Sequence, residues 1–475
     1  MKHSEYNTAV KLFVLFFALS LVGCSPSYYE DIKRGSTYNY EPGLPELWFE
    51  PSGIITPEGK PKLTVAGTIP KGSLIYKDVD GVQTASISIN IEVINTTADE
   101  TLSDTFTAKI LRKSDSGSLN DDLYNFYKTY DVKAGYFDVL ISVMDQATGK
   151  MIVREDKSHI PVLKNGARNI TNIRLLAKQK GETSDFRPIP TYDVNQTADS
   201  IKFEFQVANT GRKISPITFE VRLIKFRSDT TIASPMSSPN RAASSIEYKG
   251  IDLRNYEVIQ RTERQLTQPG NVTVEFVFDN LPNGNYRFEV GQDIEEKDRL
   301  YKAREFAIKG DNYPLVQSPR ELAEPLIYIM DPKEYEEMMQ IKSNDSLKAA
   351  VDRFWLSNIQ NSSLARTIIS MYYHRVEEAN KLFSNFKEGW KTDMGMVYIL
   401  FGPPFFQTKS LNEYKWAYSY DLTIPEYNFT FVRNKSKSDV YPFEHYVLER
   451  DNIYFQLEYR VRELWKSGRI LTATL

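Results

Sequence analysis

Two acidic residues, Glu388 and Asp393, lie on either side of Trp390 and are the side chains best placed for chemistry. Two carboxylates that flank a glycosidic bond can serve as general acid and as base or nucleophile. The chain contains 62 acidic residues, however, so pairs at this spacing arise often by chance. The alternative interpretation, which we favour, is structural: Asp393 accepts backbone N–H groups in a tight turn closed by Gly395, with help from Thr392.

Other patterns that would support catalysis or metal binding are missing from the sequence. His159, His374 and His445 lie far apart and form no His-Glu-x-x-His pair, and the chain has a single Cys, so a zinc or iron site would need carboxylates almost alone. The glycine motifs of serine hydrolases, P-loop enzymes and dinucleotide-binding proteins do not occur. A net charge of −3 provides no basic field for nucleic acid. We therefore predict no catalytic residue, no metal, no cofactor and no nucleic-acid partner, and we favour a non-enzymatic protein.

Asp393 belongs to a recognisable segment, and Glu388 directly precedes it. The segment opens with Gly389, Trp390, Thr392, Asp393 and Gly395, and it ends with Gly402 and Pro403. The segment resembles the defining motif of the GWxTD-domain family, a group of bacterial envelope proteins. The resemblance implies a domain over residues 322–468 and no established reaction or ligand.

Three further landmarks of that family occur in the expected order: the Phe354-Trp355 pair, the Tyr373–Phe383 helix and the Trp416-Ala417-Tyr418 strand. The chain departs from the family pattern at Met394 and Met396, where Arg is usual, and at Phe405, where Asp is usual. These departures put in doubt any role that needs those charges, and they leave packing roles untouched.

The N-terminus resembles that of a bacterial lipoprotein. An apolar run over residues 12–22 is too short to span a bilayer but suits a signal peptide, and it ends in Leu21-Val22-Gly23-Cys24. The resemblance implies cleavage of residues 1–23 and lipidation of Cys24, against the alternative of a buried free cysteine. Ser25 rather than Asp follows Cys24. By analogy with well-studied lipoproteins, this resemblance implies a protein attached to the outer membrane through its lipid rather than retained at the inner membrane. The periplasmic face is favoured, and the cell surface is the alternative.

Alternation of apolar and polar residues predicts two tandem all-β domains after a tether over residues 24–44. The alternation is clearest in two pairs of segments, at 87–93 and 137–143 and again at 201–207 and 272–278. A Gly and a Tyr precede a strand in both domains, at Gly135-Tyr136 and at Gly284-Asn285-Tyr286, which resembles the tyrosine corner of immunoglobulin-like sandwiches. We predict immunoglobulin-like sandwiches at residues 45–178 and 188–311, with a polar linker between them.

The apolar period then changes to that of helices. Two apolar stripes, at 347–358 and 364–386, predict a helical hairpin, and Gly389 is expected to end its second helix. A signature turn, three strands near 414–420, 427–432 and 446–454, and a closing helix near 459–467 complete the predicted α+β domain. The proline-containing stretch 312–319 is expected to be a linker.

These observations support a lipid-anchored envelope protein that acts as a non-catalytic interaction or scaffold module with an envelope protein partner. The alternative is a surface or periplasmic protein that binds or cleaves glycans through aromatic residues and the Glu388/Asp393 pair.

Overall fold

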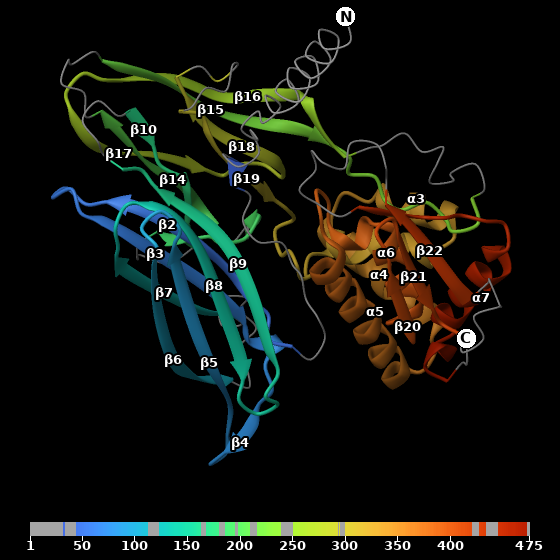
Figure 1. Ribbon diagram of the computed structural model, residues 1–475. Coiled ribbons are helices and arrows are strands. Elements are labelled where there is room, and N and C mark those ends of the chain that lie inside the picture. Colours follow the sequence, from blue (N-terminus) through green and yellow to red (C-terminus); the bar gives the residue numbers. More distant parts are fainter. Residues whose placement is uncertain are drawn as a thin grey trace, which may run out of the picture.

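The computed structural model describes residues 32–33, 44–112, 123–162, 168–179, 186–194, 198–209, 216–238, 250–292, 294, 300–419, 427–433 and 445–472. The predicted signal peptide, Cys24 and most of the predicted tether lie outside these residues. The described chain is rich in β-strands up to residue 308 and mainly helical, with one small sheet, after it (Figure 1).

The first β unit contains two antiparallel sheets that share one core. One sheet has the order β2-β3-β7. In the other, β5 pairs with β4 and β8 along one edge and with β6 along the opposite edge, and β9 pairs with β8. Inward-facing residues of both sheets, such as Ile89, Val139 and Leu63, are fully buried. The strands are β2 (Trp48–Ile55), β3 (Pro61–Pro70), β4 (Lys77–Val79), β5 (Val82–Asn95), β6 (Glu100–Arg112), β7 (Leu123–Asp131), β8 (Gly135–Asp145) and β9 (Met151–Ile160), and a short helix, η2 (Lys71–Ser73), follows β3.

The second β unit has the same arrangement with additions at its edges. One sheet runs β19-β18-β15-β16, extended by β1 and β13, and the other contains β17, β14, β11 and β12 with β10. The strands are β1 (Ile32–Lys33), β10 (Arg168–Ile170), β11 (Arg174–Gln179), β12 (Arg187–Pro188), β13 (Asp193–Val194), β14 (Ala198–Asn209), β15 (Ile217–Ser228), β16 (Ile251–Leu266), β17 (Gly270–Asp279), β18 (Gly284–Gly291) and β19 (Lys302–Ile308).

Two predicted assignments change in this unit. Strands β10 and β11 pair with β14. The end of the predicted first sandwich, from residue 168 to residue 178, therefore contributes two strands to a sheet of the second unit. Within the predicted tether, β1 pairs in parallel with β19, and Lys33 bonds to Asp156 of the first unit at 3.2 Å. This part of the tether therefore lies against both β units.

The two β units repeat the same pairing around their predicted tyrosine corners. Gly135 pairs with Ile160, and Gly284 pairs with Ile308, at the start of equivalent strands. Both glycines have a positive φ, 156° and 158°, a region that favours glycine. The echo in the sequence thus corresponds to a structural repeat.

The tyrosines of the echo, in contrast, are not equivalent. Tyr286 is the second residue after its glycine; it is fully buried, and its hydroxyl donates to the carbonyl of Pro282. Tyr136 is the first residue after its glycine, so the strand period of two turns it outward. It is 62% exposed and stacks on His159, with ring centroids 4.1 Å apart. Phe137 takes the place of Tyr286 in the first unit, and it has no hydroxyl to donate.

The C-terminal body is built around α6 (Asp393–Phe401), in which every residue is buried. A helix that is apolar on all sides belongs at the centre of a domain. Around it lie α2 (Pro319–Ala323), η5 (Glu324–Tyr328), α3 (Pro332–Met339), α4 (Asn344–Asn358), α5 (Ser362–Phe383), η6 (Gly389–Lys391), α7 (Tyr454–Lys466) and η9 (Arg469–Leu471). A small antiparallel sheet has the order β20 (Phe406–Lys409), β21 (Glu413–Ala417), β22 (Asn428–Arg433) and β23 (Tyr446–Leu448). Helix α5 lies beside this sheet, because Phe383 of α5 packs against Trp416 of β21 (Figure 1).

The predicted helical hairpin is present as α4 and α5, capped by Ser343 and Asn361. Three expectations for this body are wrong. The signature is a buried helix rather than a turn. Helix α5 ends at Phe383, so Gly389 does not end it. The stretch 312–319 is no bare linker, because Tyr313 is buried and its hydroxyl donates to the carbonyl of Asn380 at 3.1 Å.

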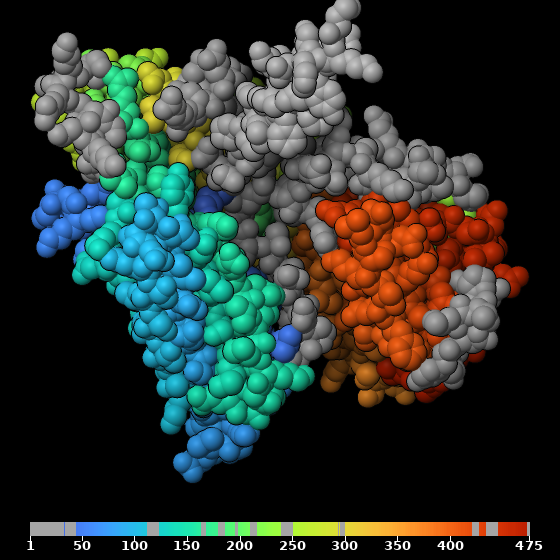
Figure 2. Space-filling model, viewed as in Figure 1, coloured from blue at the N-terminus to red at the C-terminus, as the bar shows by residue number. Residues whose placement is uncertain are grey.

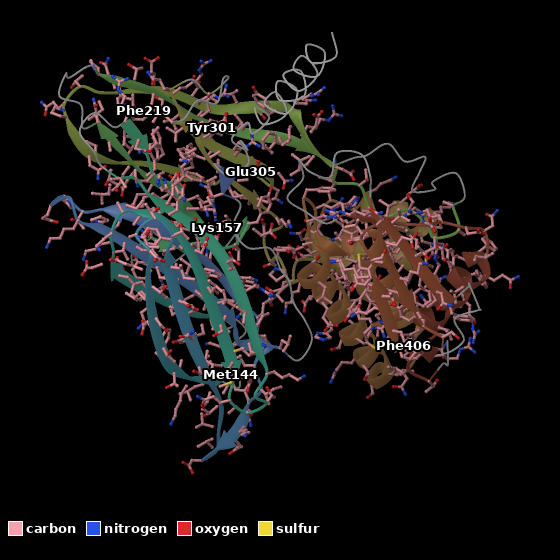
Figure 3. All side chains as sticks on the ribbon, viewed as in Figure 1. Met144, Lys157, Phe219, Tyr301, Glu305 and Phe406 are labelled. Atoms are coloured by element: carbon pink, nitrogen blue, oxygen red, sulfur yellow. The ribbon has the colours of Figure 1, made fainter. Side chains whose placement is uncertain are left out.

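In the view of Figure 2, the first β unit lies on the left and the C-terminal body on the right. The side chains of Tyr301 and Glu305 come from the second β unit, and Phe406 lies on β20 of the small sheet (Figure 3). Among the residues described, no helix is long and apolar enough to cross a membrane.

Candidate functional site

The signature segment folds as two short helices packed backbone to backbone. A Cβ atom on Gly389 would lie 1.9 Å from the carbonyl oxygen of Ala379 in α5, and one on Gly395 would lie 1.9 Å from the carbonyl oxygen of Gly389. Neither position can hold a side chain unless backbone moves. The two glycines therefore let η6 lie between α5 and α6.

Asn380 and Thr392 complete this packing with hydrogen bonds. The Asn380 side chain accepts from the backbone N–H of Trp390 at 3.2 Å and donates to the carbonyl of Pro314 at 3.0 Å. Thr392 is the N-cap of α6: its hydroxyl accepts from the N–H of Gly395 at 3.0 Å and donates to the carbonyl of Gly389 at 2.7 Å. The role of turn acceptor, assigned from the sequence to Asp393, therefore belongs to Thr392.

The Trp390 ring is buried against η5. It meets Tyr328 edge to face at 6.3 Å, and the Tyr328 hydroxyl donates to the Trp390 carbonyl at 2.7 Å. Truncating a buried ring of this size costs about 3–5 kcal/mol. Trp390 thus stabilises the C-terminal body.

Asp393 forms a bidentate ion pair with Arg450, which follows β23. The two carboxylate oxygens lie 2.5 and 2.9 Å from the guanidinium nitrogens, and one oxygen also accepts the N–H of Leu448 at 2.8 Å. The side chains are 11% and 2% exposed. The remaining guanidinium donors bond to the carbonyls of Ser234, Pro235 and Leu448. An Arg side chain has five N–H donors, and these contacts use all of its nitrogens.

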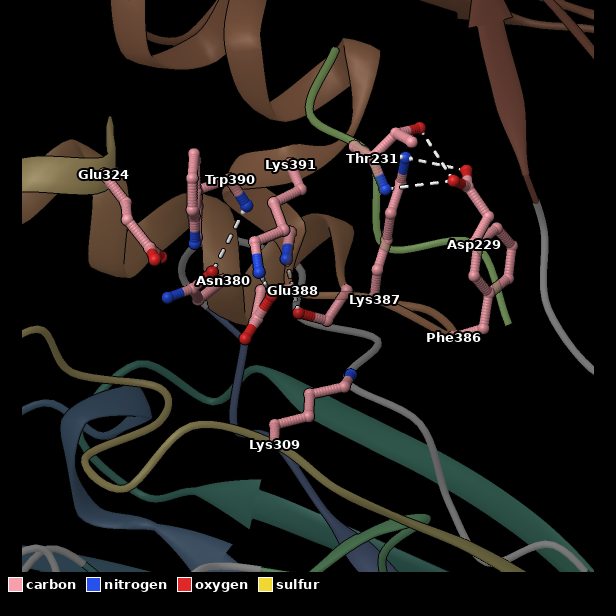
Figure 4. Close-up of polar contacts among 12 residues, drawn as sticks. Asp229, Thr231, Lys309, Glu324, Asn380, Phe386, Lys387, Glu388, Trp390 and Lys391 are labelled. Atoms are coloured by element: carbon pink, nitrogen blue, oxygen red, sulfur yellow. Dashed lines mark hydrogen bonds and ion pairs between the residues drawn. The ribbon is translucent and has the colours of Figure 1, made fainter. Parts of the chain in front are cut away.

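Glu388, the other member of the predicted pair, has a different partner. Its carboxylate lies 2.5 Å from the ammonium of Lys391, one turn further along. Figure 4 shows Glu388 and Lys391 together, with Lys309 of the second β unit below them. Each carboxylate of the predicted pair is thus neutralised by its own cation, and Asp393 is directed toward β23.

The C-terminal end of α6 is held by Arg375, Gly402 and Tyr418. Arg375 donates to the carbonyls of Ile399 and Leu400, at 3.2 and 3.3 Å, which suits a cation at a helix C-terminus. Gly402 ends α6 with a φ of 81°, and its carbonyl accepts from the hydroxyl of Tyr418 at 2.6 Å. Pro403 follows it and is exposed.

The signature also contacts a segment of the second β unit. We call residues 229–238, which follow β15, the strap. Its Met236 is fully buried in the core of the C-terminal body, and its Ser234 and Pro235 are the residues that bind Arg450. This contact could not be predicted from the sequence, since the strap has no regular period and Arg450 lies outside the motif.

A buried ionic contact holds the start of the strap. Lys387 donates to Asp229 at 3.3 Å and to the carbonyl of Thr231 at 2.7 Å (Figure 4). Burial lowers the pKa of Lys387, and the nearby Asp229 and Asp393 offset only part of that effect. Burial alone would raise the pKa of Asp229, but Lys387 and the Thr231 hydrogen bonds hold it below its usual value.

A second contact of the same kind lies beside it. Lys309 of the second β unit donates to Asp193 at 3.0 Å and to the carbonyl of Asn385 at 2.8 Å. Burial raises the pKa of Asp193, and Lys309 opposes the change. Together the two lysines fix the segment between α5 and η6 to the second β unit.

Residues 292–467 match the family model described as the GWxTD domain. No curated protein sequence matches the chain. Among solved structures, red sea bream transglutaminase aligns at 8% identity and a TM-score of 0.18, over 56% of this chain and 31% of that one. Escherichia coli alpha-2-macroglobulin activated by porcine elastase aligns at 8% identity and a TM-score of 0.19, over 76% and 36%.

Squid arrestin aligns at 7% identity and a TM-score of 0.12, over 55% of this chain and 97% of its own. This chain thus spans about a third of the length of the transglutaminase and the macroglobulin. At these TM-scores the alignments carry no argument about fold or function.

Proposed function

We propose that this chain, which belongs to the GWxTD domain-containing family, is a lipid-anchored envelope protein that acts as a non-catalytic interaction or scaffold module. The observation that supports this proposal best is the use of the signature residues. Gly389 and Gly395 allow close packing, Thr392 caps α6, and Asp393 is paired with Arg450. Each of these contacts builds the body and its junction with the second β unit.

The two β units present surface to a partner, and we propose that both are immunoglobulin-like sandwiches. In chain order, the first, second and fifth main strands form one sheet, and the third, fourth, sixth and seventh form the other. The same order recurs in both units, and sandwiches of this architecture are common in cell-surface proteins. The buried Tyr286, near the start of β18, adds a tyrosine corner in the second unit.

The proposed location is the outer membrane, with the lipid on Cys24 and the periplasmic side favoured over the cell surface. Strand β1 supports attachment close to the body, because only residues 25–31 would separate Cys24 from a strand paired with β19. An extended residue spans at most about 3.6 Å, so the second β unit would lie within a few nanometres of the bilayer. Replacement of Cys24 by Ser should abolish incorporation of labelled palmitate; incorporation at the wild-type level would contradict the anchor.

The proposed interaction is tested by affinity purification of the lipidated protein from its own membrane. We expect an envelope protein to co-purify in amounts close to equimolar. The glycan alternative is tested in the same preparation with envelope glycans, using Asp393→Asn as the variant. Glycan binding or cleavage that this variant loses would overturn the non-catalytic proposal.

A further inference from the structure

The strap has no regular structure up to Pro235 and then forms a turn, in which the N–H of Ser238 donates to the carbonyl of Pro235 at 3.3 Å. It is held in the manner of a peptide in a recognition groove. Three buried side chains of the C-terminal body bind it mainly through its backbone. Lys387 bonds to the carbonyl of Thr231 and Arg450 to the carbonyls of Ser234 and Pro235. Glu458 accepts from the N–H and the hydroxyl of Ser237, at 3.3 and 2.8 Å.

One side chain of the strap anchors it. Met236 has no exposed surface and belongs to the same core cluster as Trp390 and Met394 of the signature. Ile232 and Ala233 are half-buried against that cluster. Hydrogen bonds to the backbone of a segment, combined with a buried site for one apolar side chain, are a usual means by which proteins bind peptides.

The groove is built by the signature itself. Asp393 orients Arg450 with two hydrogen bonds, and two of the three remaining guanidinium N–H groups donate to the strap. A bidentate carboxylate fixes the plane of an Arg side chain, which a single contact would not do. Asp393 of the signature therefore acts on the strap through Arg450.

We propose that the C-terminal body contains a peptide-binding site and that the strap, with its turn at Met236, occupies it as an internal ligand. The partner it fits is a protein segment that places an apolar side chain of the size of Met one residue after a Pro, with small residues around them. This inference rests on the proposed interaction function and names the class of partner. A partner segment binds when the strap leaves, so its apparent affinity is reduced by the fraction of molecules in which the strap is released.

The test uses the full mature chain in detergent and a fluorescent peptide with the sequence of residues 229–238. Met236→Ala removes the anchor from the strap but leaves the groove intact. We expect the Met236→Ala variant to bind the peptide saturably. The wild type should bind the same peptide with an apparent affinity at least about tenfold weaker, because its own strap competes for the site. Hydrogen exchange of the strap measures its release in the same samples.

Two controls keep the test decisive. A peptide that carries Met236→Asp should not bind, since its anchor cannot enter an apolar pocket. Ser237→Ala, which deletes only one hydroxyl contact with Glu458, serves as the second variant if Met236→Ala does not fold, and a smaller gain in peptide affinity is expected.

Three results would overturn the proposal: release of the strap without peptide binding, equal binding of the Asp-containing peptide, or a strap that neither variant releases. Any of these would leave the co-purification of an envelope partner unaffected, so the two proposals fail separately.

Discussion

Asp393 is charged and buried, and its carboxylate is paired with Arg450. This combination points to a role in stability rather than in chemistry. Its carboxylate accepts two guanidinium N–H groups and one backbone N–H. Removal of one member of a buried ion pair leaves the other charge without a partner, and this usually costs more than the intact pair contributes. A carboxylate in this setting stabilises the structure around Arg450.

Asp393→Ala should therefore lower the free energy of unfolding by about 3–5 kcal/mol, more than the ~0.5–2 kcal/mol of a lost cap. Urea unfolding of the variant measures this loss. Asp345→Ala, on the exposed first turn of α4, is the matched control and should be nearly neutral. The double variant Asp393→Leu/Arg450→Met should recover part of the loss, since it removes both charges. An Asp393→Ala protein as stable as the wild type would show that the ion pair has no structural role.

His445 is a half-buried neutral base at the same junction. Asn385 accepts the N–H of Lys387 through its amide oxygen, so its amide nitrogen faces Nδ1 of His445, 3.1 Å away. That nitrogen must accept, which requires a neutral ring with its proton on Nε2. Burial lowers the pKa of His445 from 6.5 to about 4, and the nearby Lys387 adds to the effect.

Stability should therefore fall as the pH is lowered from 6.5 to about 4, because the unfolded chain takes up the proton first. The contribution is fully present above pH 6.5, and its loss amounts to about 3 kcal/mol, at about 1.4 kcal/mol for each unit of pKa. Unfolding curves at several pH values measure it. His445→Gln should flatten this part of the pH profile, whereas His374→Gln, at an exposed site on α5, should not. Equal slopes for the two variants would contradict the assignment.

At the scale of the elements, periodicity decided what the sequence could predict. Helices α4 and α5 were predicted because their apolar residues follow the helical period, and the core strands because theirs alternate. Helix α6 was missed, since a run that is apolar at every position has no period to read. The close approach of η6 to α5 was missed as well: Gly389 suggested a helix end, and only the backbone positions reveal that it permits contact.

Gly389→Ala tests this close approach. The new methyl group would overlap the carbonyl of Ala379, so backbone must shift, and we expect a loss of several kcal/mol, as for overpacked sites. Thermal unfolding of the C-terminal body is the measurement. Gly72→Ala is the control, because its Cβ would meet no atom within 4 Å, and it should change stability by less than about 0.5 kcal/mol. Similar melting of both variants would exclude the proposed packing role.

At the scale of the whole molecule, the second β unit and the C-terminal body form one structure. The strap, the lysines Lys309 and Lys387, and the packed stretch 312–319 all connect them. The sequence could not predict this arrangement, because it depends on contacts such as Arg450 to Ser234, between residues far apart in the chain.

Phe386 is the apolar centre of this junction, and it provides the test of joint unfolding. Its ring packs with buried residues of the second β unit, among them Tyr192 and Phe226, and its carbonyl accepts from Asn285 at 2.9 Å. We expect calorimetry of the wild type to show the second β unit and the C-terminal body melting in one transition. Phe386→Ala removes the shared packing, so it should separate that transition into two.

The matched control lies three positions earlier in the chain. Phe383 packs inside the C-terminal body, against Tyr398 and Trp416. Phe383→Ala should therefore lower the temperature of the joint transition without dividing it, because it weakens one partner and leaves the junction intact. If the wild type already melts in two steps, or if both variants divide the transition, the junction does not couple the two parts. The signature would then stabilise the C-terminal body alone.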